Sequence, residues 1–419
     1  MATLRPAARL RSCIRPALRP QSIRSQQGLL RPWQFCQSRG LIDDVSPPQA
    51  PDFAFAFDID GVLVRSADPL PRAAKALRLL RDNNIPFVLL TNGGGKTEAQ
   101  RVEDLSSELN FQLYTDNFIQ SHTPFAGLTD LYDKTVLVCG GDRDNCQIVA
   151  QEYGFKNVVT PGDIVTQHPE IWPFTKVFAD YYRSFAKPLP MPIVPGKPEK
   201  SLKIDAVFVY NDSRDWGLDI TVITDLLLSR EGIMGTLSEK NGDDSLPNRG
   251  YQQDGQPPLY FSNPDLWWAA KYHLSRLGQG GFREALQGVW RAITGGHGKQ
   301  PAELIKTVIG KPHQPTYEFA EKRLLAYREK LFEENLMITG HPDESKETLR
   351  PLRKVYMVGD NPESDILGGN SYKSPYGSKW QSILLKTGVY QGGEPAHKPS
   401  VIVEDVYDAV QWAIKDAKK

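Results

Sequence analysis

Two aspartates two residues apart, Asp58 and Asp60, follow the apolar run at residues 53–57. The run has the length and the Phe and Ala content expected of a strand that is buried on both faces. Because side chains alternate along an extended strand, both carboxylates should point to the same side, where a metal ion or a reacting group must offset their repulsion. Gly61 then allows a sharp turn and leaves room for a ligand. The alternative is an acidic turn without a chemical role.

Two more polar motifs stand at the ends of apolar runs further along the chain. Thr91 and Asn92 follow the run at 85–90 and precede three glycines. A hydroxyl, an amide and bare backbone N–H groups at a helix start form a natural phosphate cradle. Lys311 lies between a glycine and a proline, where its ammonium could balance a bound phosphate and the paired aspartates. Taken singly, the glycines could be a flexible turn and the lysine a solvated surface residue.

A second acidic motif follows the apolar run at 354–358. Gly359 separates Asp360 from this run, and Asp365 stands five residues further on. Carboxylate oxygens are the hard ligands that Mg²⁺ prefers, usually a few of them together with water. The motif therefore predicts a magnesium site if the fold brings it close to Asp58.

These motifs need a scaffold that holds several strand ends side by side. Short apolar runs alternate with segments of helical spacing along the chain. The expected strands are 53–57, 85–90, 135–139, 157–160, 176–179, 203–210, 304–309, 354–358, 380–385 and 400–403. The expected helices are 71–80, 98–109, 145–153, 217–231, 281–294, 316–334 and 405–415. Such alternation predicts an α/β fold, whose sheet binds small ligands at the carboxyl ends of its strands.

Residues 1–40 differ in composition from the rest of the chain. They contain eight arginines, no lysine and no acid, and their leucines and isoleucines are spaced as on an amphipathic basic helix. This composition is typical of a mitochondrial transit peptide, with processing expected near Arg39. The alternative is a basic arm that binds nucleic acid.

The remaining sequence predicts an acidic protein of two domains. Without the eight arginines of residues 1–40, 42 basic residues stand against 50 acidic ones, a net charge of −8 that gives no case for binding nucleic acid. The remaining length suits two domains better than one. No run approaches the roughly 18 apolar residues that a membrane span needs. Cys139 and Cys146 are too few for a disulfide framework or a zinc site, so they are expected to be ordinary buried thiols.

Taken together, the four motifs resemble those of the haloacid dehalogenase superfamily of phosphotransferases, in the family's order and over most of the chain. The matching segments are Asp58-Ile-Asp60-Gly-Val, Leu-Leu-Thr91-Asn, Gly-Lys311-Pro, and Gly-Asp360 followed by Asp365. The resemblance implies an α/β fold with a Rossmann-like, doubly wound core and an inserted α/β cap of the C2 type. The core would comprise residues 50–121 and 263–419, and the cap residues 122–262.

The resemblance also implies how the motifs divide the chemistry. Asp58 would be the nucleophile that forms an aspartyl phosphate, and Asp60 would protonate the leaving oxygen and later activate water. Phosphate binding would fall to Thr91 and Lys311, with help from Asn92 and the backbone amides after it. Such a set supplies the alignment and charge compensation that phosphoryl transfer requires.

The metal expected from the resemblance is Mg²⁺. Its ligands would be the carboxylates of Asp58 and Asp360 and the backbone carbonyl of Asp60, with Asp365 acting through water or by orienting the others. Because every acid of the family's motifs is present, a member without catalytic activity is disfavoured.

Additional sequence motifs resemble those of class IIA of this superfamily, which has NagD-like and p-nitrophenylphosphatase-like members. The Thr-Asn-Gly-Gly-Gly turn and the Ser262-Asn-Pro-Asp segment support that branch, although other members often have Thr where this chain has Ser262. The basic presequence and the long cap look most like the mitochondrial cat-eye-syndrome critical-region group. This resemblance implies a magnesium-dependent phosphatase of the mitochondrial matrix that acts on a small phosphorylated metabolite. Caps of this class often contribute to dimer contacts, which leaves a homodimer open.

Two other functions stay open at this stage. One is a protein of the same fold with little turnover and a binding or regulatory role, linked to mitochondrial glycerophospholipid metabolism. The other, a nucleotide-binding oxidoreductase, is disfavoured because no Gly-x-Gly-x-x-Gly follows a first strand. The motifs do not specify the leaving group of the substrate. Tyr181, Tyr182 and Arg183 form an aromatic and basic cluster that could touch it, although a partly buried surface cluster is the simpler interpretation.

Overall fold

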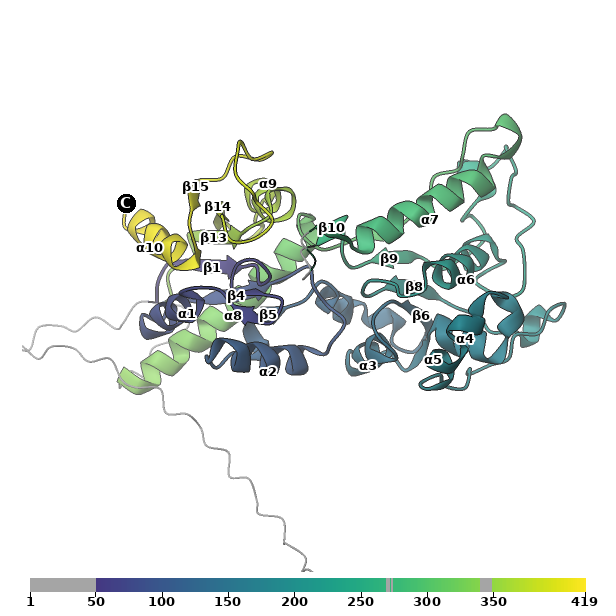
Figure 1. The fold of residues 1–419 in the computed structure, drawn as a ribbon, viewed down its shortest axis with the longest axis horizontal. Helices are drawn as coiled ribbons and strands as arrows, with labels where there is room; N and C mark the ends of the chain where they lie inside the picture. The colour runs from purple at the N-terminus through teal and green to yellow at the C-terminus, as the bar shows by residue number, and fades with distance from the viewer. Residues whose placement is uncertain (1–49, 269–271, 273, 340–348) are drawn as a thin grey trace, which may run out of the picture. The chain divides into compact units, whose positions relative to one another are not determined.

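The predicted alternation of strands and helices forms an α/β fold with two parallel sheets (Figure 1). The computed structural model describes residues 50–268, 272, 274–339 and 349–419, so the predicted transit peptide lies outside the described residues. Residues Pro47–Lys419 form one compact unit by themselves.

The first sheet has six strands in the order β15-β14-β13-β1-β4-β5, and each neighbouring pair is parallel. Its strands are β1 (Phe53–Phe57), β4 (Phe87–Leu90), β5 (Phe118–Ile119), β13 (Lys354–Gly359), β14 (Lys379–Leu385) and β15 (Val401–Val403). The central position of β1 follows from its composition, because only a strand without exposed polar positions can be covered on both faces and paired at both edges. A short hairpin of β2 (Val64–Arg65) and β3 (Asp68–Pro69) follows it.

The two faces of β1 carry side chains of different size. Phe55 and Phe57 stack at 5.2 Å between ring centroids and pack against one helical layer. Ala54 and Ala56 face the opposite layer, where their small side chains leave room for the aromatic ring of Tyr317. The helices on the Phe face are α1 (Ala73–Asp82), α2 (Glu98–Leu109) and α10 (Val406–Ala417). Those on the Ala face are α8 (Gln314–Thr339) and α9 (Leu367–Ser371). A doubly wound sheet results, as the sequence predicted.

The second sheet has five parallel strands in the order β12-β9-β8-β6-β7. Its strands are β6 (Thr135–Cys139), β7 (Asn157–Val159), β8 (Ala206–Val209), β9 (Leu259–Phe261) and β12 (Thr307–Val308). The helices that accompany it are α3 (Asn145–Glu152), α4 (Pro161–Gln167), α5 (Ala179–Arg183), α6 (Trp216–Leu228) and α7 (Gln279–Thr294). This sheet is the cap.

The cap extends past the boundary at residue 262 that the sequence predicted. Strand β12 pairs with β9 in the cap sheet, and α7 buries Phe282, Leu286 and Trp290 in the cap's apolar core. The chain therefore returns to the first sheet only after β12, at Lys311. Sequence reasoning placed the return too early because an apolar strand and an amphipathic helix do not reveal which of two similar sheets they join.

The strand predicted at 176–179 is absent. Residues Thr175–Val177 form a 3₁₀ turn, and α5 begins at Ala179. Val177 and Phe178 are exposed, so the apolar character of this segment does not come from burial in a sheet.

Two smaller expectations concern the cysteines and membrane-spanning helices. Cys139 and Cys146 are buried free thiols, and burial raises the pKa of Cys146 to about 12, as expected of unreactive core residues. Among the described residues, no helix combines the length and the apolar character needed to cross a bilayer.

One charged group in the cap should make stability depend on pH. Asp219 on α6 is buried, and this burial, with the neighbouring carboxylate of Asp215, raises its pKa to about 7. A raised pKa means that the folded state binds the proton more tightly than the unfolded state, so the stability linked to it is lost as pH rises through the folded-state pKa.

We expect Asp219→Asn to remove this dependence. Between pH 5 and pH 8 the wild-type protein should lose about 2.5 kcal/mol of unfolding free energy relative to the variant. Urea unfolding of both proteins at the two pH values measures that change. Asp180→Asn, on an exposed aspartate of α5, is the control and should follow the wild type. A constant difference between Asp219→Asn and the wild type at both pH values would contradict the assignment.

Candidate active site

The predicted site residues follow three adjacent strands of the first sheet and the last strand of the cap. Asp58 follows β1, Thr91 follows β4, and Asp360 follows β13, and these strands neighbour one another in the order β13-β1-β4. Their carboxyl ends meet at one edge, where such sheets bind ligands. A cavity of about 510 Å³ opens there, and the predicted residues that line it are Asp58, Asp60, Thr91, Asn92, Lys311 and Asp360.

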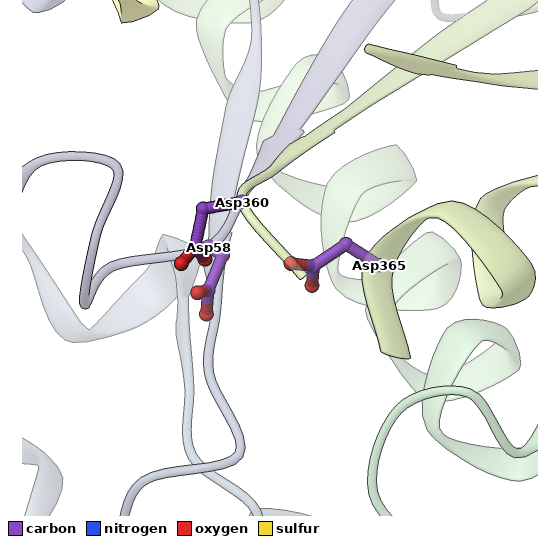
Figure 2. A group of neighbouring side chains, drawn as sticks. All are labelled: Asp58, Asp360 and Asp365. Atoms are coloured by element: carbon purple, nitrogen blue, oxygen red, sulfur yellow. The ribbon is translucent and has the colours of Figure 1, made fainter. Parts of the chain in front are cut away.

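Three buried carboxylates form the centre of the site (Figure 2). Asp58, Asp360 and Asp365 each place one oxygen within 4.8 Å of the others, and Figure 2 shows Asp365 pointing toward the other two. Asp365 is carried by a π-helical turn at Pro362–Ile366, a distortion that is frequent at functional sites. Burial raises the pKa of all three groups, that of Asp365 to about 6.

Lys311 lies between two of these carboxylates. Its Nζ is 2.6 Å from Asp58 Oδ1 and 2.7 Å from Asp365 Oδ1, and its side chain is only 2% exposed. Burial alone would lower the lysine pKa, but the two carboxylates outweigh it and the pKa is raised. Lys311 is therefore a buried cation and not a solvated surface residue. Its ammonium also opposes the rise in the pKa of Asp58.

The charges of this cluster fit a divalent cation. When ionised, the three carboxylates carry three negative charges, and one ammonium compensates a single one of them. The remaining two buried negative charges are costly unless protons or a metal ion neutralise them. Oxygen donors within 4.8 Å of one another are the ligand type that Mg²⁺ prefers, so the residues present fit this ion.

Asp60 stands apart from the carboxylate cluster. Its side chain is exposed and lines the cavity, whereas that of Asp58 is buried. Water reaches this carboxyl group, but the protein around it partly desolvates it and raises its pKa, and the charge of Arg101 opposes this rise. Desolvation of this kind favours the protonated carboxyl that a general acid needs.

Two glycines allow the chain to pass close to Asp360. Gly61 has φ of +88°, and a Cβ there would lie 2.5 Å from Asp360 Oδ2. At Gly388 a Cβ would lie 1.8 Å from the same oxygen, and the next residue, Val389, donates its backbone N–H to it at 2.5 Å. Sequence reasoning missed the second contact. The sequence signal for this contact is the segment Leu384-Leu-Lys-Thr-Gly388 at the end of β14, which has the same form as the Leu-Leu-Thr-Asn-Gly segment at the end of β4.

The glycine turn after Thr91 is less available to a phosphate than predicted. Gly93 N–H donates to Thr91 Oγ1 at 2.9 Å, and Gly95 N–H donates to His122 Nε2 at 3.1 Å. At the start of α2, Thr97 and Gln100 form a capping box, so the backbone N–H groups of these two residues already have hydrogen-bond partners. Thr91 itself is buried at the cavity wall, and its hydroxyl hydrogen can be donated to a ligand.

Asn92 contacts the backbone of Lys311. Its Oδ1 accepts the Lys311 N–H at 2.7 Å, and its Nδ2 donates to the Lys311 carbonyl at 2.9 Å and to Asp265 Oδ2 at 3.0 Å. These bonds use both ends of the amide, so the side chain holds Lys311 in place instead of offering donors to a phosphate. The position of Lys311 thus depends on a contact between the β4 strand end and the cap boundary, which no local sequence pattern reveals.

We expect Asn92→Asp to lower kcat for a phosphate ester about a hundredfold, because a catalytic group displaced by about 1 Å commonly costs that much. The change removes both donated hydrogen bonds and places a carboxylate against Asp265, whose pKa burial already raises to about 6. Steady-state kinetics measures the loss. The double variant Asn92→Asp/Asp265→Asn restores a donor opposite an acceptor and should recover part of the rate. Unchanged kinetics in the single variant would show that the amide does not position Lys311.

The cap supplies the rest of the cavity wall, which sequence reasoning did not identify. Its lining residues include Arg214, Trp216, Trp267, Trp268 and Arg276. The aromatic and basic cluster proposed from sequence lies elsewhere: Tyr181 and Tyr182 line a separate space of about 40 Å³ inside the cap, and their hydroxyls donate to Asp142 and Asp215. The simpler interpretation of that cluster, a partly buried structural group, fits these contacts.

Comparison with known sequences identifies relatives over most of the chain. Residues 55–156 match the family described as haloacid dehalogenase-like hydrolase, and residues 308–409 match one described as HAD-hydrolase-like. The mitochondrial hydrolase YKR070W of Saccharomyces cerevisiae is 38% identical over 367 residues, which cover 85% of this chain and 94% of that protein. A cardiolipin synthase (CMP-forming) / mitochondrial hydrolase fusion protein of Schizosaccharomyces pombe is 39% identical over 366 residues. The match covers 87% of this chain and 53% of the fusion protein.

Solved structures with the same fold cover both the core and the cap. A hypothetical protein, PH1952, of Pyrococcus horikoshii aligns with a TM-score of 0.52 and 18% identity over 86% of this chain and 99% of its own. The p-nitrophenyl phosphatase of Archaeoglobus fulgidus aligns with a TM-score of 0.50 and 15% identity over 87% and 99%. At such low identity these likenesses establish the arrangement of core and cap alone.

Proposed function

The chain belongs to the haloacid dehalogenase-like hydrolases, and from this premise we propose that it is a magnesium-dependent phosphatase acting through an aspartyl phosphate. The observation that carries the proposal is the position of Lys311. Its ammonium is within 2.7 Å of both Asp58 and Asp365 at the wall of the cavity. A cation held there both keeps a carboxylate nucleophile ionised and attracts a phosphate dianion.

The first step is attack by Asp58 on the phosphorus of a monoester. A carboxylate oxygen of Asp58 forms the new bond to phosphorus as the bond to the ester oxygen breaks. Asp60, on the solvent side of the cavity, gives its proton to the departing alkoxide. Lys311 and the Thr91 hydroxyl hold the phosphoryl oxygens through the transfer.

The second step returns the enzyme to its starting state. Asp60, now ionised, takes a proton from a water molecule, which attacks the phosphorus of the aspartyl phosphate. The bond between phosphorus and the Asp58 oxygen breaks, and inorganic phosphate leaves with both carboxyl groups restored. The raised pKa of Asp60 suits a group that must be protonated in one step and ionised in the next.

Mg²⁺ would be held by the carboxylates of Asp58 and Asp360 and by the backbone carbonyl of Asp60. When bound, it would compensate the negative charge on the transferred group and the two uncompensated charges of the cluster. Asp365 is fully buried and paired with Lys311, so its contribution is to orient the lysine and to complete the acidic environment.

We further propose that the protein works in mitochondria. The budding-yeast relative is named a mitochondrial hydrolase, and the fission-yeast relative a mitochondrial hydrolase fused to a cardiolipin synthase. The arginine-rich composition of residues 1–40 agrees with import into that organelle. The fusion favours a substrate from glycerophospholipid metabolism.

The test is phosphate release by residues 41–419, which keep the compact unit Pro47–Lys419 whole. A panel of sugar phosphates, nucleotides, glycerol phosphates, lipid phosphates and p-nitrophenyl phosphate is assayed with Mg²⁺ and with a chelator. We expect hydrolysis of at least one ester that is lost with the chelator and restored by Mg²⁺. Asp360→Asn should raise the Mg²⁺ concentration needed for half-maximal activity. Turnover that is insensitive to chelation would contradict the metal assignment, and silence across the panel would favour the binding role.

A further inference from the structure

An exposed apolar hairpin stands beside the catalytic cavity. Strands β10 (Trp267–Trp268) and β11 (Arg276–Leu277) pair antiparallel, and Gly278 N–H donates to the Leu266 carbonyl at 2.9 Å. We call the described residues 266–268, 272 and 274–277 the aromatic hairpin. Its large apolar side chains are 43% to 55% exposed, and they are Leu266, Trp267, Trp268, Tyr272, Leu274 and Leu277.

The aromatic hairpin is continuous with the catalytic site. Trp267, Trp268, Arg276 and Leu277 line the same cavity as the nucleophile Asp58. A ligand whose phosphate reaches Asp58 therefore meets an apolar and aromatic surface on the cap side. Grouped exposure of two indoles and three leucines is unusual for a protein surface and marks an interaction site.

The composition of the hairpin fits the interface of a lipid bilayer. Trp and Tyr are enriched where membranes meet water, because their rings are apolar and their N–H and O–H groups remain in contact with headgroups. Arg276 is exposed, and its guanidinium lies 4.8 Å from the centre of the Tyr272 ring. An arginine in this place can contact a lipid phosphate while the neighbouring rings and leucines enter the acyl boundary.

The charge of the hairpin segment favours an anionic membrane as its binding partner. The stretch 266–278 contains no acidic residue, although residues 41–419 together carry eight more acidic than basic residues. An acidic protein is repelled by an anionic membrane except where such a stretch faces it. A partner protein is a poorer occupant, because strands of two residues each offer far less than the roughly 800 Å² per partner of a stable interface.

We propose that the aromatic hairpin docks on an anionic bilayer and delivers the phosphate monoester of a membrane lipid to Asp58. This inference rests on the proposed phosphatase function and gives its substrate class. The acyl chains stay in the membrane, the hairpin enters the headgroup layer, and the terminal phosphate crosses the cavity to Asp58 and Lys311.

Vesicle flotation tests the docking without requiring turnover. Residues 41–419 are used because the eight arginines of residues 1–40 would bind anionic vesicles by charge alone. The protein should float with vesicles of equal parts phosphatidylcholine and phosphatidylglycerol, and much less with phosphatidylcholine alone. Trp267→Ser/Trp268→Ser should weaken binding at least about tenfold, because each indole would lose its burial in the bilayer. Leu266→Ser/Leu274→Ser is a second variant in case the first does not fold.

The matched control removes apolar surface elsewhere on the cap. Phe174 and Val177 are 71% and 84% exposed, more than any of the large apolar side chains of the hairpin. Phe174→Ser/Val177→Ser should float like the wild type. Equal loss in the control would show that exposed apolar side chains bind the vesicles nonspecifically and that the hairpin has no special role. Wild-type protein that does not float would overturn the docking. A change in oligomeric state by light scattering, with no vesicle binding, would assign the hairpin to protein contacts instead.

Kinetics then connects the docking to the substrate. Leu266 and Leu274 are exposed and do not line the cavity, so Leu266→Ser/Leu274→Ser should leave hydrolysis of p-nitrophenyl phosphate unchanged. Its kcat/KM for phosphatidic acid in anionic vesicles should fall at least about tenfold, in line with the loss of binding. An equal loss on both esters, or none on either, would overturn the proposal. Wild-type protein that floats and hydrolyses another ester of the panel, but not phosphatidic acid, would overturn the lipid substrate. Flotation together with silence across the whole panel would refute the phosphatase function and leave the docking standing.

Discussion

Replacing Asp58 by asparagine is expected to lower kcat/KM at least about a thousandfold, the scale on which loss of a nucleophile acts when the remaining groups still bind substrate. The neutral amide cannot attack phosphorus as the carboxylate does, yet it has the same shape. Lys311 keeps Asp365 as its partner at 2.7 Å, so the variant should remain folded. Steady-state kinetics and urea unfolding of the same preparations separate the two effects.

The control for this substitution is Asp82→Asn, the same chemical change on an aspartate whose side chain is 64% exposed at the end of α1. It should keep wild-type kinetics. Turnover retained in Asp58→Asn would contradict the proposed role of Asp58 as the nucleophile. Retention of the cellular role together with loss of turnover would instead support the binding function that the sequence left open.

Replacing Lys311 by methionine should have the second large effect, on stability as well as on rate. The change leaves Asp58 and Asp365 buried without their cation, and breaking a buried pair in this way costs about 3 to 5 kcal/mol. The lysine normally opposes the rise in the pKa of both carboxyl groups, so their pKa values rise further without it. Carboxyl groups with raised pKa values contribute stability at low pH and lose it as pH rises. The loss should therefore be larger at pH 8 than at pH 5.

Urea unfolding at the two pH values measures this effect, and phosphate release should fall below detection. Lys322→Met removes an exposed lysine of α8 that pairs with Glu318 across one turn, and it should change stability by less than about 0.5 kcal/mol. Lys311→Met/Asp365→Asn removes one of the two buried carboxylates that have lost their lysine partner. This double variant should regain part of the stability without regaining activity. Equal stability of Lys311→Met and the wild type at pH 8 would mean that the lysine is not a compensating charge.

The chemistry of the site could be predicted from the sequence because most of its residues lie at strand ends. Asp58, Thr91 and Asp360 each follow an apolar run that forms a strand of the first sheet, and parallel strands bring such ends together whatever the loops do. Lys311 follows β12 of the other sheet, so its place in the group was predicted from its charge and from the resemblance to a known family, not from a shared sheet edge. Its burial between two carboxylates could not be read from a lysine flanked by glycine and proline.

The remaining features depend on tertiary contacts that leave no local pattern. Asn92 has the composition of a phosphate ligand, but its partners, Lys311 and Asp265, are more than 170 residues away. Gly388 ends a segment similar to the one at the end of β4, but its close approach to Asp360 is visible only in the structure. The cap boundary was placed too early because β12 could extend either sheet, and the aromatic hairpin was overlooked because exposed tryptophans look like core residues in a sequence.

The most direct test of the account is to find the phosphate on the protein. Asp60→Asn should slow breakdown of the aspartyl phosphate more than its formation from p-nitrophenyl phosphate, whose leaving group departs without a proton. The variant is therefore mixed with Mg²⁺ and this ester, quenched in acid, reduced with borohydride and digested. We expect peptide mass spectrometry to find the reduced residue at Asp58, in amounts that depend on Mg²⁺ and that vanish when Asp58→Asn is added to the variant. A phosphoryl group on any other residue, or turnover by wild-type protein with no labelled peptide in Asp60→Asn, would contradict it.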